Sequence, residues 1–213
     1  MIARFVSQFR PQVFGSPELL LPVVLLLTWK VTAIASNDKI LILALLLTGA
    51  LAVYSWRVLD RNAWLVRLGW TRPCRRQWTW SVFCGLTAAA TVSAIALAFH
   101  ESLGPFPRLN QLLLASISGP MAEELLFRGL LFWALLKALS HIRVRQSRAQ
   151  IITILLVAVA FAGAHIGRVG VSFICTILTG ASFGVMRVWS QSTVTAALMH
   201  AAYNFGLCWM TLI

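Results

Sequence analysis

Seven long apolar stretches dominate this chain and limit what it can fold into. A helix needs about 20 largely apolar residues to cross the hydrocarbon core of a bilayer. The chain is 59% hydrophobic and 11% charged, whereas soluble domains average about half apolar and a quarter charged residues. This composition excludes a soluble globule and a disordered chain. The stretches cover residues 19–35, 40–56, 78–99, 112–136, 151–166, 171–186 and 193–213.

The predicted fold is therefore all-α: a polytopic transmembrane helical bundle of about seven spans. A helix satisfies its own backbone polar groups, which lipid cannot do. We expect residues 1–213 to form a single integral-membrane domain. Within it, Gly163 with Gly167 and Gly180 with Gly184 have the spacing of small residues at close helix contacts.

The distribution of Lys and Arg predicts the orientation. With a cytoplasmic N-terminus, the inside segments hold thirteen of the eighteen basic residues, including Arg187, and the outside segments hold three. This bias favours the N-terminus inside and the C-terminus outside. The formal charge of +12 is then explained by topology and by anionic lipid headgroups. We accordingly expect membrane lipid as a partner and no nucleic acid.

The span at residues 112–136 carries charges that a lipid-facing helix would not tolerate. Charged side chains at bilayer depth cost about 2.5 to 3.5 kcal/mol each and default to a functional role. Glu124 and Arg128 are four residues apart, so they can pair on one face of the helix. Glu123 points about 100° away and gains no such partner from its own helix. It is thus a candidate general base in a low-dielectric site.

Two further spans carry polar side chains at similar depth. Phe161 and His165 are one turn apart in FAGAH, and His200 and Asn204 are one turn apart in HAAYN. Counting about 1.5 Å per residue from the cytoplasmic end places Glu123, both histidines and Asn204 in the middle of the bilayer. Such a set suits amide hydrolysis: Glu123 with His165 can activate water, and His200 with Asn204 can stabilise the oxyanion.

The three motifs together resemble a known family. EELLFR at 123–128, FAGAH at 161–165 and HAAYN at 200–204 match the EExxxR, FxxxH and HxxxN motifs of the CPBP or Abi family. This family contains CAAX prenyl proteases and bacteriocin-processing enzymes, and it includes myxosortase-like bacterial members. The resemblance covers residues 112–213 and implies a glutamate-type intramembrane endopeptidase.

The resemblance also implies the role of each motif residue. Glu123 and His165 would activate water, His200 and Asn204 would bind the oxyanion, and Glu124 and Arg128 would hold the site together. Phe161 would orient His165. The implied substrate is a C-terminal membrane-anchored tail or a bacteriocin-type precursor, in a prokaryotic inner membrane.

Several alternatives remain open at this stage. Glu123, His165 and His200 could hold zinc with an open position, although Asn204 is a better oxyanion donor than zinc ligand, so we expect no metal. A non-catalytic immunity or scaffold protein could keep the same polar cluster for stability. A proton-coupled transporter could use Glu123 and His165 as a relay, but no inverted repeat is evident. The sequence leaves the oligomeric state open.

Overall fold

A computed structural model describes residues 66, 68–100, 116, 119–165 and 169–210. The chain divides into two compact units, Met1–Ser55 and Trp56–Ile213, and every described residue lies in the second. The first two predicted spans, at residues 19–35 and 40–56, therefore lie outside the described residues. In the described part all regular structure is helical, as predicted.

The described helices include long apolar ones. Three of them, α5 (Arg75–Ala98), α9 (Gln146–Gly163) and α10 (Gly170–Ser190), are long and apolar enough to cross a membrane. Large side chains such as Phe83, Leu155 and Leu178 are more than half exposed on these helices. Exposed apolar side chains on membrane-length helices are suited to contact lipid. These helices agree with three of the seven predicted spans, and the full number of seven is not confirmed.

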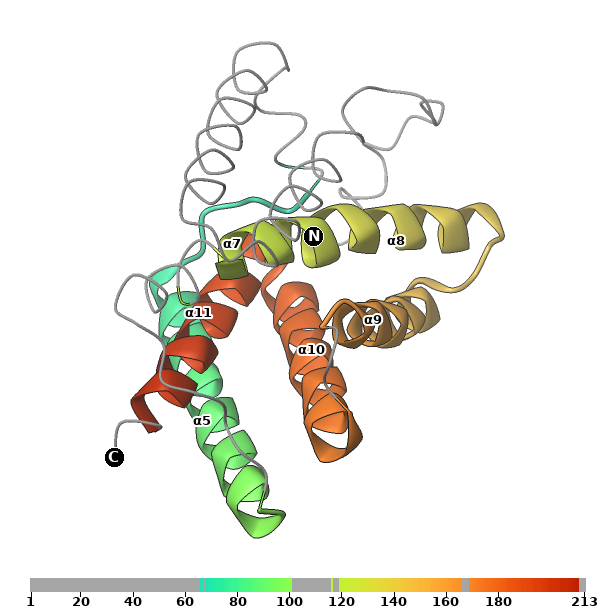
Figure 1. Ribbon diagram of the computed structural model, residues 1–213. Coiled ribbons are helices and arrows are strands. Elements are labelled where there is room, and N and C mark those ends of the chain that lie inside the picture. Colours follow the sequence, from blue (N-terminus) through green and yellow to red (C-terminus); the bar gives the residue numbers. More distant parts are fainter. Residues whose placement is uncertain (1–65, 67, 101–115, 117–118, 166–168, 211–213) are drawn as a thin grey trace, which may run out of the picture. The chain divides into compact units, whose positions relative to one another are not determined.

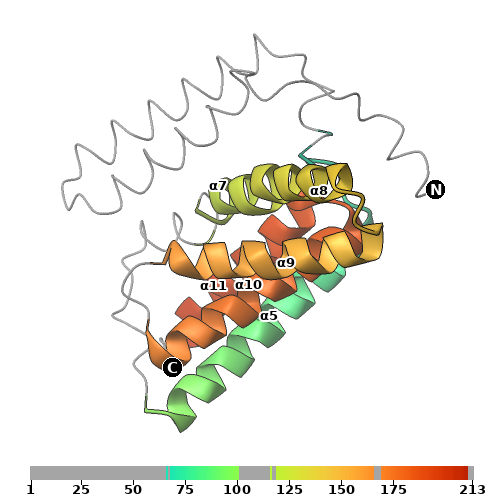
Figure 2. The ribbon, with the colours of Figure 1, turned by 90° about the vertical axis from the view of Figure 1, so that its right-hand side faces the viewer.

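Helix α5 lies alongside α11 (Thr193–Met210), as Figures 1 and 2 show. Small residues at Ser81, Gly85 and Ala89 form the buried stripe of α5. A side chain at Gly85 would stand 2.3 Å from the Met199 carbonyl oxygen, and one at Gly206 would stand 2.7 Å from the Ala89 methyl group. Because these positions have no side chain, the two helix backbones approach closely. The two helices run parallel, since Gly85 faces Met199 and Ala89 faces Gly206 further along both helices.

Helices α9 and α10 form an antiparallel pair. Gly180 faces Phe161 and Ala158, and Gly184 faces Ile154, so the predicted close contact through Gly180 and Gly184 is confirmed. The predicted partner of Gly163, Gly167, lies outside the described residues. Gly163 is the exposed last residue of α9, and no described residue lies within 4 Å of the position that its side chain would take.

The predicted span at 112–136 is not a uniform α-helix. It contains α7 (Gly119–Glu124), a π-helix η3 (Leu125–Leu131) and α8 (Phe132–His141). The helix therefore continues five residues past its predicted end, through the mostly polar residues 137–141. A π-helical turn is wider than an α-helical one and is found mostly at functional sites. Here it follows directly after the two adjacent glutamates.

The segment before α5 is tied to the turn between α10 and α11. The Thr193 backbone N–H donates to the Gly69 carbonyl oxygen at 2.7 Å, and the Thr193 hydroxyl donates to that of Leu68 at 2.6 Å. The Gln77 amide donates to the Ser190 carbonyl oxygen at 3.1 Å. These bonds bring the start of α5 to the start of α11, which fixes the register of the parallel pair.

Candidate active site

Glu124 and Arg128 form the buried ion pair that their spacing predicts. Arg128 Nη1 donates to Glu124 Oε1 at 2.9 Å, and neither side chain is exposed. Arg128 Nη2 donates to the Gly180 carbonyl oxygen at 2.7 Å. The guanidinium therefore joins α7 to α10, and the absence of a side chain at Gly180 leaves room for this approach. A charged bond in a dry interior is strong because no water competes with it.

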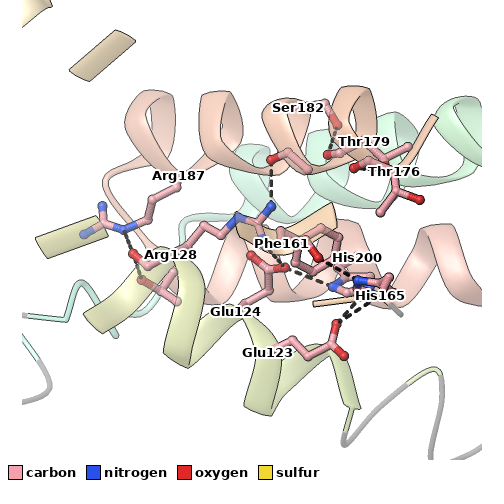
Figure 3. A network of polar contacts seen from close by, with 12 residues as sticks. Glu123, Glu124, Arg128, Phe161, His165, Thr176, Thr179, Ser182, Arg187 and His200 are labelled. Atoms are coloured by element: carbon pink, nitrogen blue, oxygen red, sulfur yellow. Dashed lines mark hydrogen bonds and ion pairs between the residues drawn. The ribbon is translucent and has the colours of Figure 1, made fainter. Parts of the chain in front are cut away.

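His200 on α11 is bound by the same glutamate. Its Nδ1 lies 2.9 Å from Glu124 Oε1, the oxygen that also accepts from Arg128. Figure 3 shows Glu124 between the guanidinium and the imidazole. Glu124 thus has two partners on two other helical segments, whereas the sequence had indicated only Arg128. Its carboxylate orients the His200 ring as well as neutralising the arginine.

The remaining glutamate faces both histidines. Glu123 Oε2 lies 3.9 Å from His165 Nε2 and 3.9 Å from His200 Nε2. The three side chains come from α7, from the end of α9 and from α11, and Figure 3 shows them converging on one point. The predicted convergence of these three residues is therefore present. The Glu123 and His200 side chains are 6% and 5% exposed, whereas that of His165 is 20% exposed, so His165 is the most accessible member of the cluster.

His165 does not lie inside a span as the sequence predicted. Helix α9 ends at Gly163, and the His165 backbone N–H donates to the Ala162 carbonyl oxygen at 3.0 Å in the turn that follows. Its Nδ1 lies 2.8 Å from the Phe161 carbonyl oxygen. The last carbonyls of a helix lack intrahelical partners, and the imidazole satisfies one of them. This bond holds the ring at the helix end.

The partners of the two Nδ1 atoms determine what each Nε2 can do. The Phe161 carbonyl and the arginine-paired Glu124 carboxylate are acceptors, so each Nδ1 carries a hydrogen and donates it. In a neutral ring, Nε2 then has a lone pair and no hydrogen. Glu123 is thus approached by two imidazole nitrogens that accept a proton when neutral and donate one when the ring is charged.

Aromatic rings enclose the polar cluster. The Phe161 ring lies 4.5 Å from that of His165 and 5.6 Å from that of His200, between centroids. The Arg128 guanidinium carbon lies 4.4 Å from the Phe161 ring centre. Phe183 on α10 stacks on His200 at 4.7 Å. Sequence reasoning missed Phe183, since nothing in the sequence distinguishes it from the other apolar residues of its span.

The structure also describes Asn204 and Arg187. Asn204 lies one turn after His200 on α11 and is half-buried. Arg187 was assigned to a cytoplasmic loop, but α10 continues to Ser190 and Arg187 is only 8% exposed. Its Nε donates to the Arg128 carbonyl oxygen at 3.3 Å. A cation in the last turn of a helix interacts favourably with the helix dipole, which offsets part of the cost of burying Arg187.

The zinc alternative fits this geometry poorly. Ligands at about 2.0–2.1 Å from a tetrahedral zinc ion lie about 3.3 Å from each other, and both nitrogens are 3.9 Å from Glu123 Oε2. Within residues 66–210, as far as they are described, no three His, Cys, Asp or Glu side chains form a group that could hold a metal ion. No step of the chemistry below is assigned to a metal.

Apolar helices surround the cluster of Glu123, His165 and His200, which is consistent with a membrane-embedded enzyme. Comparison with protein families agrees: residues 104–206 match the model of the type II CAAX prenyl endopeptidase Rce1-like family. The chain carries a domain of this family, and the protein is an intramembrane protease. The match begins before the first motif and ends after the third. No curated protein and no solved structure gives a significant match to the chain.

Proposed function

We propose that the protein is a glutamate-type intramembrane endopeptidase that hydrolyses a peptide bond near the membrane surface. The observation that carries the proposal is the pair of 3.9 Å separations between Glu123 Oε2 and the two histidine Nε2 atoms. They are too long for direct hydrogen bonds and of the length that one water molecule bridges. A water bonded there would be held by three groups able to take its proton or donate to it.

Glu123 and His165 have the positions of the base. The carboxylate and the neutral Nε2 of His165 both accept hydrogen bonds from the attacking water, and its proton passes to Glu123 as the oxygen bonds to the substrate carbonyl carbon. When the intermediate collapses, the C–N bond breaks and the same proton goes to the leaving amine. The greater exposure of the His165 side chain supports an approach of the scissile carbonyl from that side of the cluster.

His200 and Asn204 are the proposed oxyanion donors. The Nδ1 hydrogen of His200 is engaged by Glu124 at 2.9 Å, so His200 donates through Nε2 only when the ring is charged. A hydrogen on Nε2 would give the site a donor where the oxyanion develops. The Asn204 amide, one turn further along α11, is proposed as the second donor. Glu124, Arg128 and Phe161 support these groups through the contacts described above.

The proposed substrate is a membrane-associated protein or peptide. Family membership implies a protein substrate, and the narrower assignment is a C-terminal membrane-anchored tail or a bacteriocin-type precursor. We further propose that the enzyme resides in a prokaryotic inner membrane with its N-terminus in the cytoplasm, because the basic residues collect on that side.

The test compares Glu123→Gln with a matched change at another acid. The purified protein in detergent is given a fluorescence-quenched peptide ending in a prenylated Cys-aliphatic-aliphatic-X sequence, or a transmembrane segment with a short C-terminal tail. Glu123→Gln should lower kcat by about 10²–10⁴-fold and leave the unfolding midpoint nearly unchanged. Glu101→Gln, outside all three motifs, should leave kcat unchanged. A Glu123→Gln variant with more than a tenth of the activity, or activity lost to a chelator and restored by zinc, would overturn the mechanism.

A further inference from the structure

The ring of Phe183 is stacked on the His200 imidazole. The two ring centroids are 4.7 Å apart and the ring planes differ by 21°. Phe183 is completely buried and belongs to α10, which contributes none of the motif residues. Offset stacking between rings at this distance is favourable by about 0.5–1.5 kcal/mol beyond the burial of area. The contact therefore restrains the imidazole at its flat face.

A hydrogen bond at one ring atom does not fix the plane of an imidazole. Glu124 Oε1 holds His200 Nδ1 at 2.9 Å, but the ring could still rock about that bond and swing Nε2 away from Glu123. A stacked ring removes this freedom, because rocking would drive the imidazole edge into the phenyl face. The Glu124 bond and the Phe183 stack together determine where Nε2 lies.

Phe183 is itself held in place by its neighbours. The Phe161 ring meets it edge-on at 6.3 Å, and the Tyr203 ring meets it at 5.9 Å and 70°. The Arg128 guanidinium carbon lies 5.4 Å from its centre, so the arginine that binds Glu124 also contacts the ring that covers His200. Both restraints on His200 are thus coupled through Arg128.

We propose that Phe183 is a positioning residue for catalysis: it sets the plane of the His200 ring so that Nε2 points at the water-binding point opposite Glu123. This rests on the proposed function of His200. Phe183 is completely buried and stacks on His200, so it acts on the reaction through His200. Active sites tolerate errors of only about 0.5 Å or 10–20° in the placement of such a group.

The chain offers a closely matched control in Phe127. It is also buried, meets Phe161 edge-on at 5.3 Å, and has the Arg128 guanidinium carbon at 5.9 Å from its ring. Phe127→Leu and Phe183→Leu therefore both remove a ring that contacts Phe161 and Arg128, and they differ in the Phe183 contacts with His200 and Tyr203. Both variants should lose similar stability by thermal unfolding in detergent.

Activity and a spectroscopic signature are then compared. Phe183→Leu should lower kcat by about 10–10²-fold, the size expected for a misplaced group, with KM nearly unchanged. Phe127→Leu should keep kcat within about threefold, and Phe183→Tyr, which keeps the stacked ring, should recover most of the activity. In NMR spectra, the carbon-bound His200 ring protons should lose their upfield ring-current shift in Phe183→Leu and keep it in Phe127→Leu.

The outcomes separate this proposal from the protease mechanism. If Glu123→Gln stays active, the mechanism fails, while the NMR comparison still decides whether Phe183 holds the His200 ring. If Glu123→Gln is inactive but the two Phe→Leu variants have equal kcat at equal stability, the positioning role is wrong and the mechanism stands. An unchanged His200 resonance in Phe183→Leu would also overturn the proposal.

Discussion

Removing the guanidinium of Arg128 should destabilise the protein more than most single substitutions. Arg128 and Glu124 are both completely buried, and the arginine joins Glu124 at 2.9 Å to the Gly180 carbonyl oxygen at 2.7 Å. An Arg128→Met variant keeps most of the aliphatic stem, so little cavity is created. The change therefore isolates the loss of charge from the loss of packing.

The structure sets the size of the effect. Without Arg128, the Glu124 carboxylate stays buried with the imidazole of His200 as its charged or polar contact. Breaking one partner of a buried pair costs about 3–5 kcal/mol, which is about 10²–10⁴-fold in the unfolding equilibrium. Adding Glu124→Gln to Arg128→Met should recover much of the lost stability. The neutral amide oxygen still accepts a hydrogen bond from His200, and no buried charge remains.

The Glu124–Arg128 ion pair also does not use all of its hydrogen-bonding atoms, so we expect the double variant to recover more of the lost stability. In the part of the chain that the structure describes, Glu124 Oε2 and Arg128 Nε are buried without a hydrogen-bond partner. Each such atom lowers the net benefit of the ion pair. The neutral double variant removes the unpaired guanidinium nitrogen and the unpaired carboxylate charge together.

The assay is a double-mutant cycle on reversible unfolding in mixed micelles. The two single variants and the double variant are each compared with the unchanged protein. We expect a coupling free energy of about 2 kcal/mol or more, since residues in one buried network are not additive. A cost below about 1 kcal/mol for Arg128→Met, or additivity within about 0.5 kcal/mol, would refute the reasoning.

Two further predictions concern helix packing and orientation. Gly85→Ala should lower stability by about 1–3 kcal/mol, because its methyl group would meet the Met199 carbonyl oxygen at 2.3 Å. Gly163→Ala, with no described residue within 4 Å of the added methyl group, should be neutral or stabilising by less than about 1 kcal/mol. An equal loss in both variants, measured by thermal unfolding, would contradict the close α5–α11 contact. For orientation, the exposed His141 and His100 are replaced by Cys in a cysteine-free background. A membrane-impermeant maleimide should label position 100 in intact cells and position 141 only after lysis, and the reverse pattern would invert the predicted topology.

The sequence by itself indicated the helical class of the fold and the glutamates, arginine and histidines that the structure brings into contact. Membrane helices satisfy their backbones internally and must present apolar side chains to lipid, so hydropathy shows where they lie. The same cost marks Glu123 and Glu124 as exceptions within an apolar span. The Glu124–Arg128 pair followed from four-residue spacing on one helix, which is a local property.

Tertiary structure decided how the cluster is connected. Glu124 contacts His200 across 76 residues, and no spacing rule reaches that far. Local backbone geometry also departed from expectation, since η3 interrupts the α-helix after Glu124 and His165 lies beyond the end of α9. Phe183 became relevant only when α10 packed its ring against His200. Hydropathy scores how apolar a residue is, whereas the neighbour that its side chain meets depends on helix rotation and on the glycines that let backbones approach.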